Sequence, residues 1–284
     1  MGSEETMYRK IDQITPSQLY LSSERLKDVN NIETEPLPIR RIGDELFFTD
    51  GHHRAFTLYK KGEKEVEVYT DEDDMDWLQY LICVNWCEKE GIYTIADMSD
   101  RIVSEKEFNE LWIERCQSMH EQVDEDIFQF IEFCEEDDLD VKSEVCKNIL
   151  NQLPEHFGIE QAVNDYIDGV RDKFFISVRI YDTPVGFTAL KEHNKFTSEV
   201  YVIGILEEFQ GRGIGKRLME KVEQHLKSQG KRYLTVKTLG PSHPDEGYEK
   251  TRAFYRCVGF LPLEEFTTLW DENNPCLFMI KSLN

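Results

Sequence analysis

The sequence predicts two domains of the mixed α/β (α+β) class. In that second domain, an apolar segment at residues 199–206 leads into a glycine-rich run, and an amphipathic segment at residues 218–226 follows it. This order is typical of a strand, a tight turn and a helix. The first 70 residues have turn-forming prolines and glycines of their own. We therefore divide the chain into residues 1–70, a helical connector at residues 71–117 and a C-terminal domain at residues 118–284.

The first segment contains a short apolar strand that ends at Asp50 and Gly51, and a helix that begins at the next residues. A helix N-terminus carries partial positive charge and unpaired N–H groups, which favour anions. The two histidines and the arginine at this point would add three cations, so the loop predicts a site for phosphate or a nucleotide. The alternative is that His53 and Arg54 only cap the helix and form ion pairs. The residues of this candidate site are Asp50, Gly51, His52, His53 and Arg54.

The connector has a helical pattern, and its acidic residues lie at the start, where they complement the helix dipole. Cys83 and Cys87 lie four residues apart among tryptophans and aliphatic residues, which favours a buried helix face over half of a metal site. No second cysteine pair completes a zinc set, so no metal is expected. The acidic run at residues 135–140 is interpreted as a linker or a solvated helix end.

Strand signals recur along the C-terminal domain as short apolar or β-branched runs bounded by turn residues. The run at residues 262–270 is either one arm of a hairpin with Trp270 in the core, or a segment that lines the substrate entrance. The expected strands are residues 174–181, 185–190, 199–206, 233–239 and 276–280.

The glycine-rich run is the strongest functional signal. Glycines at alternate positions let consecutive backbone N–H groups point into one concavity, and the following helix adds its positive end, an arrangement suited to phosphate oxygens. The spacing matches neither a P-loop nor the dinucleotide fingerprint. We expect anion binding by Gln210, Gly211, Arg212, Gly213, Ile214, Gly215 and Lys216.

This run resembles the coenzyme A signature of the GNAT superfamily of N-acetyltransferases, in which Gln210, Gly213 and Gly215 occupy the fixed positions. Residues 251–260 are similar to the late helix of that family and its Tyr-x-x-x-Gly-Phe ending. Glu199 lies eleven residues before Gln210, where several members carry a glutamate base. The resemblance covers residues 118–284 and implies a GNAT fold, a mixed and mostly antiparallel sheet flanked by helices, that binds acetyl-CoA.

The resemblance also implies roles for single residues. Glu199 would be the general base, and its alternative is a surface strand residue. Backbone N–H groups from Ile203, Gly204 and Ile205 would bind the acetyl carbonyl and coenzyme. Tyr255 would stabilise the departing thiolate, and its alternative is a core aromatic residue. Tyr248 stands where the family often has an asparagine that contacts the coenzyme.

The segment around residues 38–59 resembles the ParB/sulfiredoxin-like fold, whose members carry an Asp-Gly-His-x-Arg type of loop for nucleotide phosphates. This resemblance implies ATP or ADP with Mg at the N-terminal domain. A phosphotransferase site there would use Asp50, Glu33 or Glu35 as its carboxylate. The sulfiredoxin cysteine is replaced by His52 and the following residues are acidic, so sulfiredoxin chemistry and DNA partitioning are not expected.

The charge and composition of the chain limit which binding partners and which compartment are expected. The net charge of −23 repels nucleic acid and favours a cationic amine acceptor, such as a polyamine, an aminoglycoside-like antibiotic, a small metabolite amine or a lysine side chain. Seven cysteines without framework spacing indicate a reducing compartment, which we expect to be the cytoplasm. We expect neither a signal peptide nor a membrane span.

Three function classes follow. The favoured one is an acetyl-CoA-dependent N-acetyltransferase that acts on a primary amine by direct transfer and carries an N-terminal nucleotide- or phosphate-binding module. The second is a bifunctional enzyme whose N-terminal domain is a phosphotransferase of the free-serine-kinase type. The third is a regulatory protein that senses acetyl-CoA and nucleotide without turnover. An oligomer contact, such as a homodimer, is a further role open to the N-terminal domain.

Overall fold

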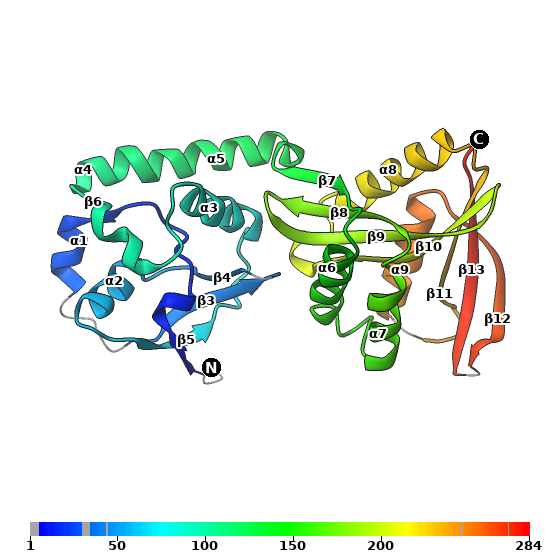
Figure 1. The fold of residues 1–284 in the computed structure, drawn as a ribbon, viewed down its shortest axis with the longest axis horizontal. Coiled ribbons are helices and arrows are strands. Elements are labelled where there is room, and N and C mark those ends of the chain that lie inside the picture. Colours follow the sequence, from blue (N-terminus) through cyan, green and yellow to red (C-terminus); the bar gives the residue numbers. More distant parts are fainter. Residues whose placement is uncertain (1–5, 30–34, 44, 245, 272) are drawn as a thin grey trace. The chain divides into compact units, whose positions relative to one another are not determined.

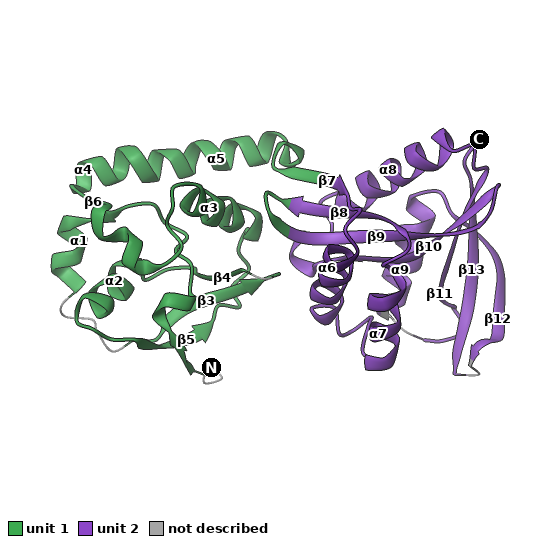
Figure 2. Cartoon of the chain, viewed as in Figure 1, with its two compact units in different colours: residues 1–132, 180–183 green, residues 133–179, 184–284 purple. Residues whose placement is uncertain are grey.

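The structure is a computed structural model that describes all residues except 1–5, 30–34, 44, 245 and 272. It has two compact units, shown in two colours in Figure 2. Unit 1 comprises residues 1–132 and 180–183, and unit 2 comprises residues 133–179 and 184–284. The boundary that we expected after residue 117 falls inside a helix, because that helix continues to residue 125 with buried Met119 and Val123 on one side.

Unit 1 is built on a four-stranded sheet of order β1-β5-β3-β4. The central pair β3 and β5 is parallel, and the two outer pairs are antiparallel. Its apolar core includes Ile39, Phe47, Phe48 and Val68. The strands are β1 (Met7–Lys10), β3 (Leu37–Ile42), β4 (Glu45–Phe48) and β5 (Glu65–Thr70).

Helices and a small second sheet complete unit 1. The parallel strands β2 (Leu21–Ser22) and β6 (Ile102–Val103) form that second sheet. The connector is therefore only partly helical: a 3₁₀ segment at Ile95–Asp100 and β6 interrupt it. The helices are α1 (Ser23–Asp28), α2 (His52–Lys60), α3 (Trp77–Lys89), α4 (Glu105–Phe108) and α5 (Glu114–Glu125), and a π-helical turn at Asn109–Ile113 joins the last two. Cys83 and Cys87 lie on the buried face of α3, as the sequence predicted.

Unit 2 is built on a seven-stranded sheet of order β12-β13-β11-β10-β9-β8-β7. Strands β10 and β11 are parallel, whereas β9–β10, β11–β13 and β12–β13 are antiparallel. The strands are β7 (Ile131–Glu135), β8 (Phe174–Ile180), β9 (Thr183–Asn194), β10 (Thr197–Ile205), β11 (Tyr233–Leu239), β12 (Leu261–Asp271) and β13 (Asn274–Ser282).

Helices cover both faces of this sheet, with α8 on one side and α6 and α7 on the other (Figure 1). Helix α8 buries a stripe of apolar residues spaced by about four positions, the spacing of one helix face. Asp138, from the acidic run, begins α6 by accepting hydrogen bonds from the N–H groups of Asp140 and Val141. The helices are α6 (Leu139–Asn151), α7 (Glu160–Gly169), α8 (Ile214–Ser228) and α9 (Glu246–Cys257).

The sheet opens between its two parallel strands. β10 and β11 pair only from Thr197 to Val200 on β10, opposite Tyr233 to Val236 on β11. A register shift in β10 follows at once, between Val200 and Val202, and β10 then continues beside β9 alone. Backbone groups on the β11 side of β10 are thus released from the sheet next to the glycine-rich turn.

The C-terminal strands form the expected hairpin, but the interpretation that Trp270 lies in the core is wrong. Trp270 keeps 46% of its surface exposed, because β12 is the edge strand of the sheet and this end of it faces solvent. Leu261 and Leu263 on the same strand are also exposed. In the part of the chain that is described, no helix is both long enough and apolar enough to cross a membrane.

Candidate active site

The glycine-rich turn has the geometry of an anion cradle. Gly211 and Gly213 both have positive φ, 74° and 82°, a conformation that side chains disfavour. Gly213 is the N-cap of α8, and the first helical bond runs from the Arg217 N–H to the Gly213 carbonyl at 3.0 Å. Among the described residues, the preceding N–H groups, those of Ile214 and Gly215, have no acceptor. They lie at the positive end of a 15-residue helix.

Two neighbours fix this turn against the sheet. The Gln210 side chain donates from Nε2 to the Ile205 carbonyl at 2.8 Å, and so connects the turn to the end of β10. A Cβ atom added at Gly215 would lie 3.0 Å from Phe254 of α9 and 3.3 Å from Ile205. Gly215 is therefore needed for close packing, whereas Gly211 and Gly213 are needed for their backbone conformation.

The strand residues expected at the acetyl group lie in the opened part of β10. Ile203 and Gly204 are paired with β9 and lie beyond the last β10–β11 pair. A Cβ atom at Gly204 would come within 3.0 Å of Ile149 and 3.3 Å of Leu153, so α6 covers this strand closely. The strand and the glycine turn are thus consecutive in the chain and adjacent in space.

Glu199 is buried, with 6% of its surface exposed, and it forms an ion-paired cluster across three strands. Its Oε2 lies 2.8 Å from His193 Nε2 on β9 and 2.9 Å from Lys237 Nζ on β11. Lys237 also donates to Oε1 at 3.1 Å. The alternative of a surface strand residue is therefore wrong for Glu199.

Neither partner of Glu199 was predicted from the sequence. His193 lies six residues earlier on the other arm of the β9–β10 hairpin, and Lys237 lies two residues after Thr235, the residue that pairs with Glu199 on β11. Both side chains are about one-third exposed, 33% for His193 and 30% for Lys237. A histidine near the end of one strand of a hairpin and a lysine on the following strand are the signals that could have identified them.

Tyr255 lies on the buried side of α9, packed against Phe254 and Phe260. Its burial raises the pKa of the phenol well above the usual range, and Tyr166 and Tyr248 contribute in the same direction. The hydroxyl is thus a neutral donor at physiological pH. Its place supports the core interpretation, and the thiolate role stays a prediction.

Tyr248, in the position of the family asparagine, lies near the start of α9. Its hydroxyl donates to the His156 carbonyl at 3.2 Å, and the two rings lie 5.4 Å apart. Two histidine atoms in this region, Nδ1 of His156 and of His243, are buried without a partner among the described residues, as is Oγ1 of Thr238 on β11. Buried polar atoms nearly always have partners in folded proteins, so these orphans fit a ligand beside the end of β11.

The N-terminal loop does not bring three cations together. His52 Nε2 accepts a hydrogen bond from the Ser17 N–H at 2.9 Å, and His53 Nε2 accepts one from the Ser22 N–H at 2.9 Å. Burial lowers the pKa of both imidazoles to about 4. Both rings are therefore neutral at physiological pH, because each uses its lone pair to satisfy a backbone donor.

Arg54 is also occupied. Its guanidinium donates to the Glu35 carbonyl at 3.0 Å and lies 3.7 Å from the Glu35 carboxylate. Gly51, with φ of 75°, is the N-cap of α2. Asp50 is exposed. Glu33 lies outside the described residues.

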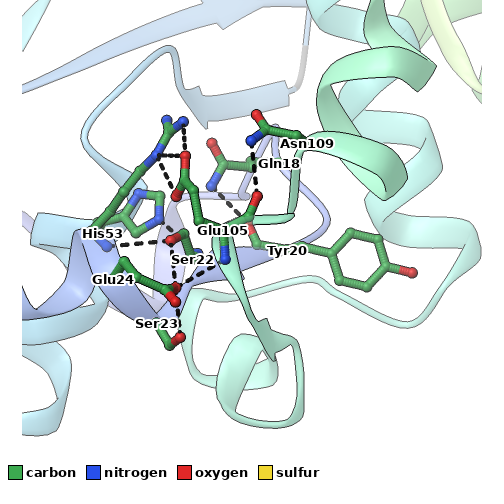
Figure 3. A network of polar contacts seen from close by, with 9 residues as sticks. Gln18, Tyr20, Ser22, Ser23, Glu24, His53, Glu105 and Asn109 are labelled. Carbon is green, nitrogen blue, oxygen red and sulfur yellow. Dashed lines mark hydrogen bonds and ion pairs between the residues drawn. The ribbon is translucent and has the colours of Figure 1, made fainter. Parts of the chain in front are cut away.

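His53 belongs to a structural network that connects α1 to α4 (Figure 3). Glu24 accepts from the Glu105 N–H at 2.9 Å, and Arg25 holds the Glu105 carboxylate with both Nε and Nη2. These contacts favour the interpretation of capping and pairing over that of a phosphate site. Within the described residues, no group of three or more His, Cys, Asp or Glu side chains is placed to hold a metal ion.

A split parallel strand pair, a glycine-rich turn and an ion-paired carboxylate lie together in unit 2. Residues 143–260 match the model of the Acetyltransferase (GNAT) family, and all of them except residues 180–183 belong to unit 2. This part of the chain is therefore similar to a GNAT acetyltransferase domain.

Curated relatives match over limited segments. A mycothiol acetyltransferase of Actinosynnema mirum is 40% identical over 72 residues, which cover 25% of this chain and 24% of that protein. One of Saccharopolyspora erythraea is 39% identical over 57 residues, 20% of this chain and 19% of that protein. An uncharacterized N-acetyltransferase of Chlorobaculum tepidum is 30% identical over 107 residues, 38% of this chain and 61% of that protein. The chain thus spans less than two thirds of each of these relatives.

Part of the chain is also similar to solved structures. A GNAT-family protein from Desulfovibrio desulfuricans has a TM-score of 0.48 at 16% identity, covering 54% of this chain and 99% of that one. An aminoglycoside 6'-N-acetyltransferase complexed with coenzyme A has a TM-score of 0.45 at 16% identity, covering 54% of this chain and 97% of that one.

Proposed function

We propose that the protein is an acetyl-CoA-dependent N-acetyltransferase that transfers the acetyl group directly to a primary amine. The observation that carries this proposal is the position of the glycine turn. Its free N–H groups follow directly on the strand that has separated from β11. A phosphate-bearing ligand on the turn would extend naturally into the opening between these strands.

The residues for the coenzyme are those of the turn and the end of β10. Gly211 and Gly213 permit close approach of phosphate, and Lys216 adds charge at the same helix end. Acetyl-CoA, when bound, supplies the acetyl thioester. Backbone N–H groups of β10 from Ile203 to Ile205 that face away from β9 donate to the negative charge that develops on its carbonyl oxygen, and each such donor contributes about 3 kcal/mol.

Glu199 and His193 remove the proton from the attacking amine. In the neutral tautomer that donates from Nε2 to Glu199, the Nδ1 atom of His193 carries a free lone pair on the more exposed side chain. The buried carboxylate fixes the tautomer and stabilises the imidazolium that forms. Lys237 holds the carboxylate from the other side and keeps its orientation. We therefore propose that the general base is a pair of residues, His193 and the more buried Glu199.

The net charge of the chain and the charges next to Glu199 both bear on the class of amine acceptor. The net charge of −23 attracts cationic amines over the whole surface. Lys237 lies directly beside Glu199 and offsets its charge, so an acceptor with an acidic group near its amine is also admissible. Two relatives carry the name mycothiol acetyltransferase, which favours a small molecule over a protein lysine.

Release of the free CoA thiol from acetyl-CoA tests the function. The full chain is incubated with a panel that comprises a polyamine, an aminoglycoside, amino sugars, amino acids and a lysine peptide. We expect amine-dependent thiol release with at least one class, and acetylation of the amine nitrogen by mass spectrometry. Binding of acetyl-CoA without turnover on any amine would instead favour the sensing alternative, and absence of binding would overturn the proposal.

The contacts of residues 50–54 do not favour the predicted nucleotide site. Two of its three cations are neutral acceptors and the third is paired. The N-terminal module with ATP or ADP, its phosphotransferase chemistry and a homodimer contact therefore stay predictions without a supporting contact.

A further inference from the structure

A cavity of about 380 Å³ lies in unit 2, between the C-terminal end of α8 and the sheet. Its walls come from β8, β9 and β10, from the last turn of α8 and from the residues just after that helix. The volume lies within the range of sites for small organic molecules, about 300–1,000 Å³. The cavity is therefore large enough to hold a ligand of its own.

This cavity is separate from the proposed acetyl-transfer site. In the β9–β10 ladder, Ser198 lies opposite Glu192, and Glu199 lies opposite Lys191. Successive strand residues point to opposite faces of a sheet, so Ser198 faces the cavity whereas Glu199 faces away from it. Along α8, His225 follows Ile214 by eleven positions, which corresponds to about 17 Å of helix. A molecule in the cavity thus reaches neither the proposed base nor the glycine turn.

The inner wall of the cavity is apolar and partly aromatic. Leu190 and Leu226 are buried, with 4% and 2% of their surface exposed. The Phe174 ring stacks on the His225 imidazole, with the ring centres 3.5 Å apart and 22° between the planes. Both rings line the cavity, so its shape and polarity favour a flat apolar body.

The imidazole in this wall is uncharged. Nε2 of the Gln229 amide lies 3.2 Å from Nε2 of His225. An amide nitrogen can only donate, so the imidazole accepts at Nε2 and carries its single proton on Nδ1. Burial also lowers the pKa of His225, and it outweighs the opposite effect of the Glu135 carboxylate. The wall therefore supplies no cation from the histidine.

The charged residues at the mouth of the cavity are paired with one another or face elsewhere. Asp172 lies 2.8 Å from the Lys173 ammonium, and Glu192 lies 2.8 Å from that of Lys231. Lys191 is on the opposite face of the sheet, beside Glu199. A charged ligand would lose hydration against the apolar wall without gaining an unpaired counter-charge, and this loss is unfavourable.

One polar side chain inside the cavity has no partner in the protein. Ser198 has only 2% of its surface exposed. Its carbonyl accepts a hydrogen bond from the Thr235 hydroxyl at 3.3 Å, but no described residue forms a hydrogen bond with its Oγ. Buried hydroxyls normally have a partner, and a serine hydroxyl can both donate and accept. The Ser198 hydroxyl is thus available to a ligand that brings one hydrogen-bonding group.

We propose that this cavity binds a small, uncharged aromatic molecule of the phenol type. The aromatic ring lies against the apolar wall formed by Phe174, Leu190 and Leu226, and the hydroxyl of the ligand pairs with Ser198 Oγ. The site belongs to unit 2 and is distinct from the site of the amine acceptor. The proposal does not depend on acetyl transfer.

Three probes that share one phenol ring and differ in charge test the class of ligand. They are 4-ethylphenol, which is neutral, tyramine, which is a cation, and 4-hydroxyphenylacetate, which is an anion at pH 7. Each is titrated into the full chain, and binding is followed through the histidine ring signals in proton NMR. We expect 4-ethylphenol to bind at least tenfold more tightly than either charged probe. Equal affinities for the three probes, or no binding of 4-ethylphenol at millimolar concentration, would overturn the proposal.

The same spectra locate the ligand. The chain has seven histidines, and the signals that disappear in His225→Gln assign His225. Because an aromatic ligand shifts the signals of protons near its ring, 4-ethylphenol should shift the His225 signals in the unmodified protein. A shift at His156 or His193 without one at His225 would place the probe at the proposed acetyl-transfer site, contrary to the proposal.

Ser198→Ala tests the hydrogen bond. Its loss should weaken 4-ethylphenol binding about five- to tenfold, the effect of one hydrogen bond between neutral groups. The Ser198 hydroxyl has no partner in the protein, so the variant should melt at nearly the wild-type temperature. Ser177→Ala is the matched control, because Ser177 is also a buried strand serine but its hydroxyl donates to Glu136 at 2.6 Å. Wild-type affinity in a folded Ser198→Ala variant, or an equal loss in folded Ser177→Ala, would contradict the role of Ser198.

Discussion

A single negative charge at the N-cap of α8 should have opposite effects on the stability of the helix and on the affinity for the coenzyme. Gly213 is exposed and has φ of 82°, so any side chain there is strained, and asparagine and aspartate tolerate this region better than most. Gly213→Asp and Gly213→Asn have nearly the same shape and share this strain. Their difference therefore isolates the effect of one negative charge.

The two consequences of that charge have opposite signs. A carboxylate at the helix N-terminus stabilises the ligand-free helix through the dipole, by about 0.3–1 kcal/mol. The same carboxylate opposes a pyrophosphate on the turn: at a separation of about 6 Å and an effective dielectric of about 20, one charge pair costs about 3 kcal/mol. Salt and side-chain freedom at an exposed loop reduce this to about 1.4–2 kcal/mol, or a ten- to thirtyfold loss in affinity.

Calorimetric titration with acetyl-CoA and a thermal melt of the free protein measure both effects. We expect Gly213→Asp to bind ten- to thirtyfold more weakly than Gly213→Asn, and to melt at the same or a higher temperature without ligand. Gly211→Asn is a further comparison, since a Cβ at Gly211 meets no atom within 4 Å. Equal affinities of the two Gly213 variants would refute the placement of the pyrophosphate on this turn.

Two further predictions concern proton transfer and pH. Glu199→Gln and His193→Gln should each lower the acetylation rate by about 10²-fold or more at pH 6–7. The deficit should shrink toward pH 9–10, where the amine loses its proton unaided; Glu192→Gln, on the exposed part of β9, is the control, and a variant profile parallel to wild type would assign the base elsewhere. His52 has its pKa lowered by burial to about 4, so the unfolded chain binds a proton below pH 6.5 that the folded chain refuses. The free energy of unfolding should therefore fall by about 2 kcal/mol between pH 7.5 and pH 5 through this group. In urea titrations, His52→Gln should remove that part of the pH dependence, and an unchanged slope would contradict the buried neutral imidazole.

The part of the fold that local pattern controls could be predicted from the sequence. β11 runs from Tyr233 to Leu239 as expected, because its apolar run is bounded by turn residues on both sides. The glycine turn was also predictable, since the positive φ values at Gly211 and Gly213 are conformations that glycine adopts most readily. At these places a few neighbouring residues decide the structure.

The parts that depend on tertiary contacts could not be predicted. Whether His52 is a cation depends on Ser17, which lies 35 residues away and supplies the N–H that the imidazole accepts. Glu199 acquires its partners from two other strands, and the register of the sheet, not the spacing in the sequence, brings them together. Trp270 is exposed because its strand lies at the edge of the sheet, and strand order is a property of the whole unit.

Because the pairing of β10 with β11 ends early, hydrogen exchange of the β10 amides should report whether the site is occupied. Inside a sheet, each amide proton is protected from exchange with solvent by its partner on the next strand. In β10 that protection stops after Val200 on the side that faces β11, so the amides there are held only by what enters between the strands. Their hydrogen exchange should be fast in the free protein and slow when the opening is filled, whereas Thr197 to Val200 exchange slowly in both states. The exchange rates of these backbone amides therefore measure ligand occupancy without any label on the ligand.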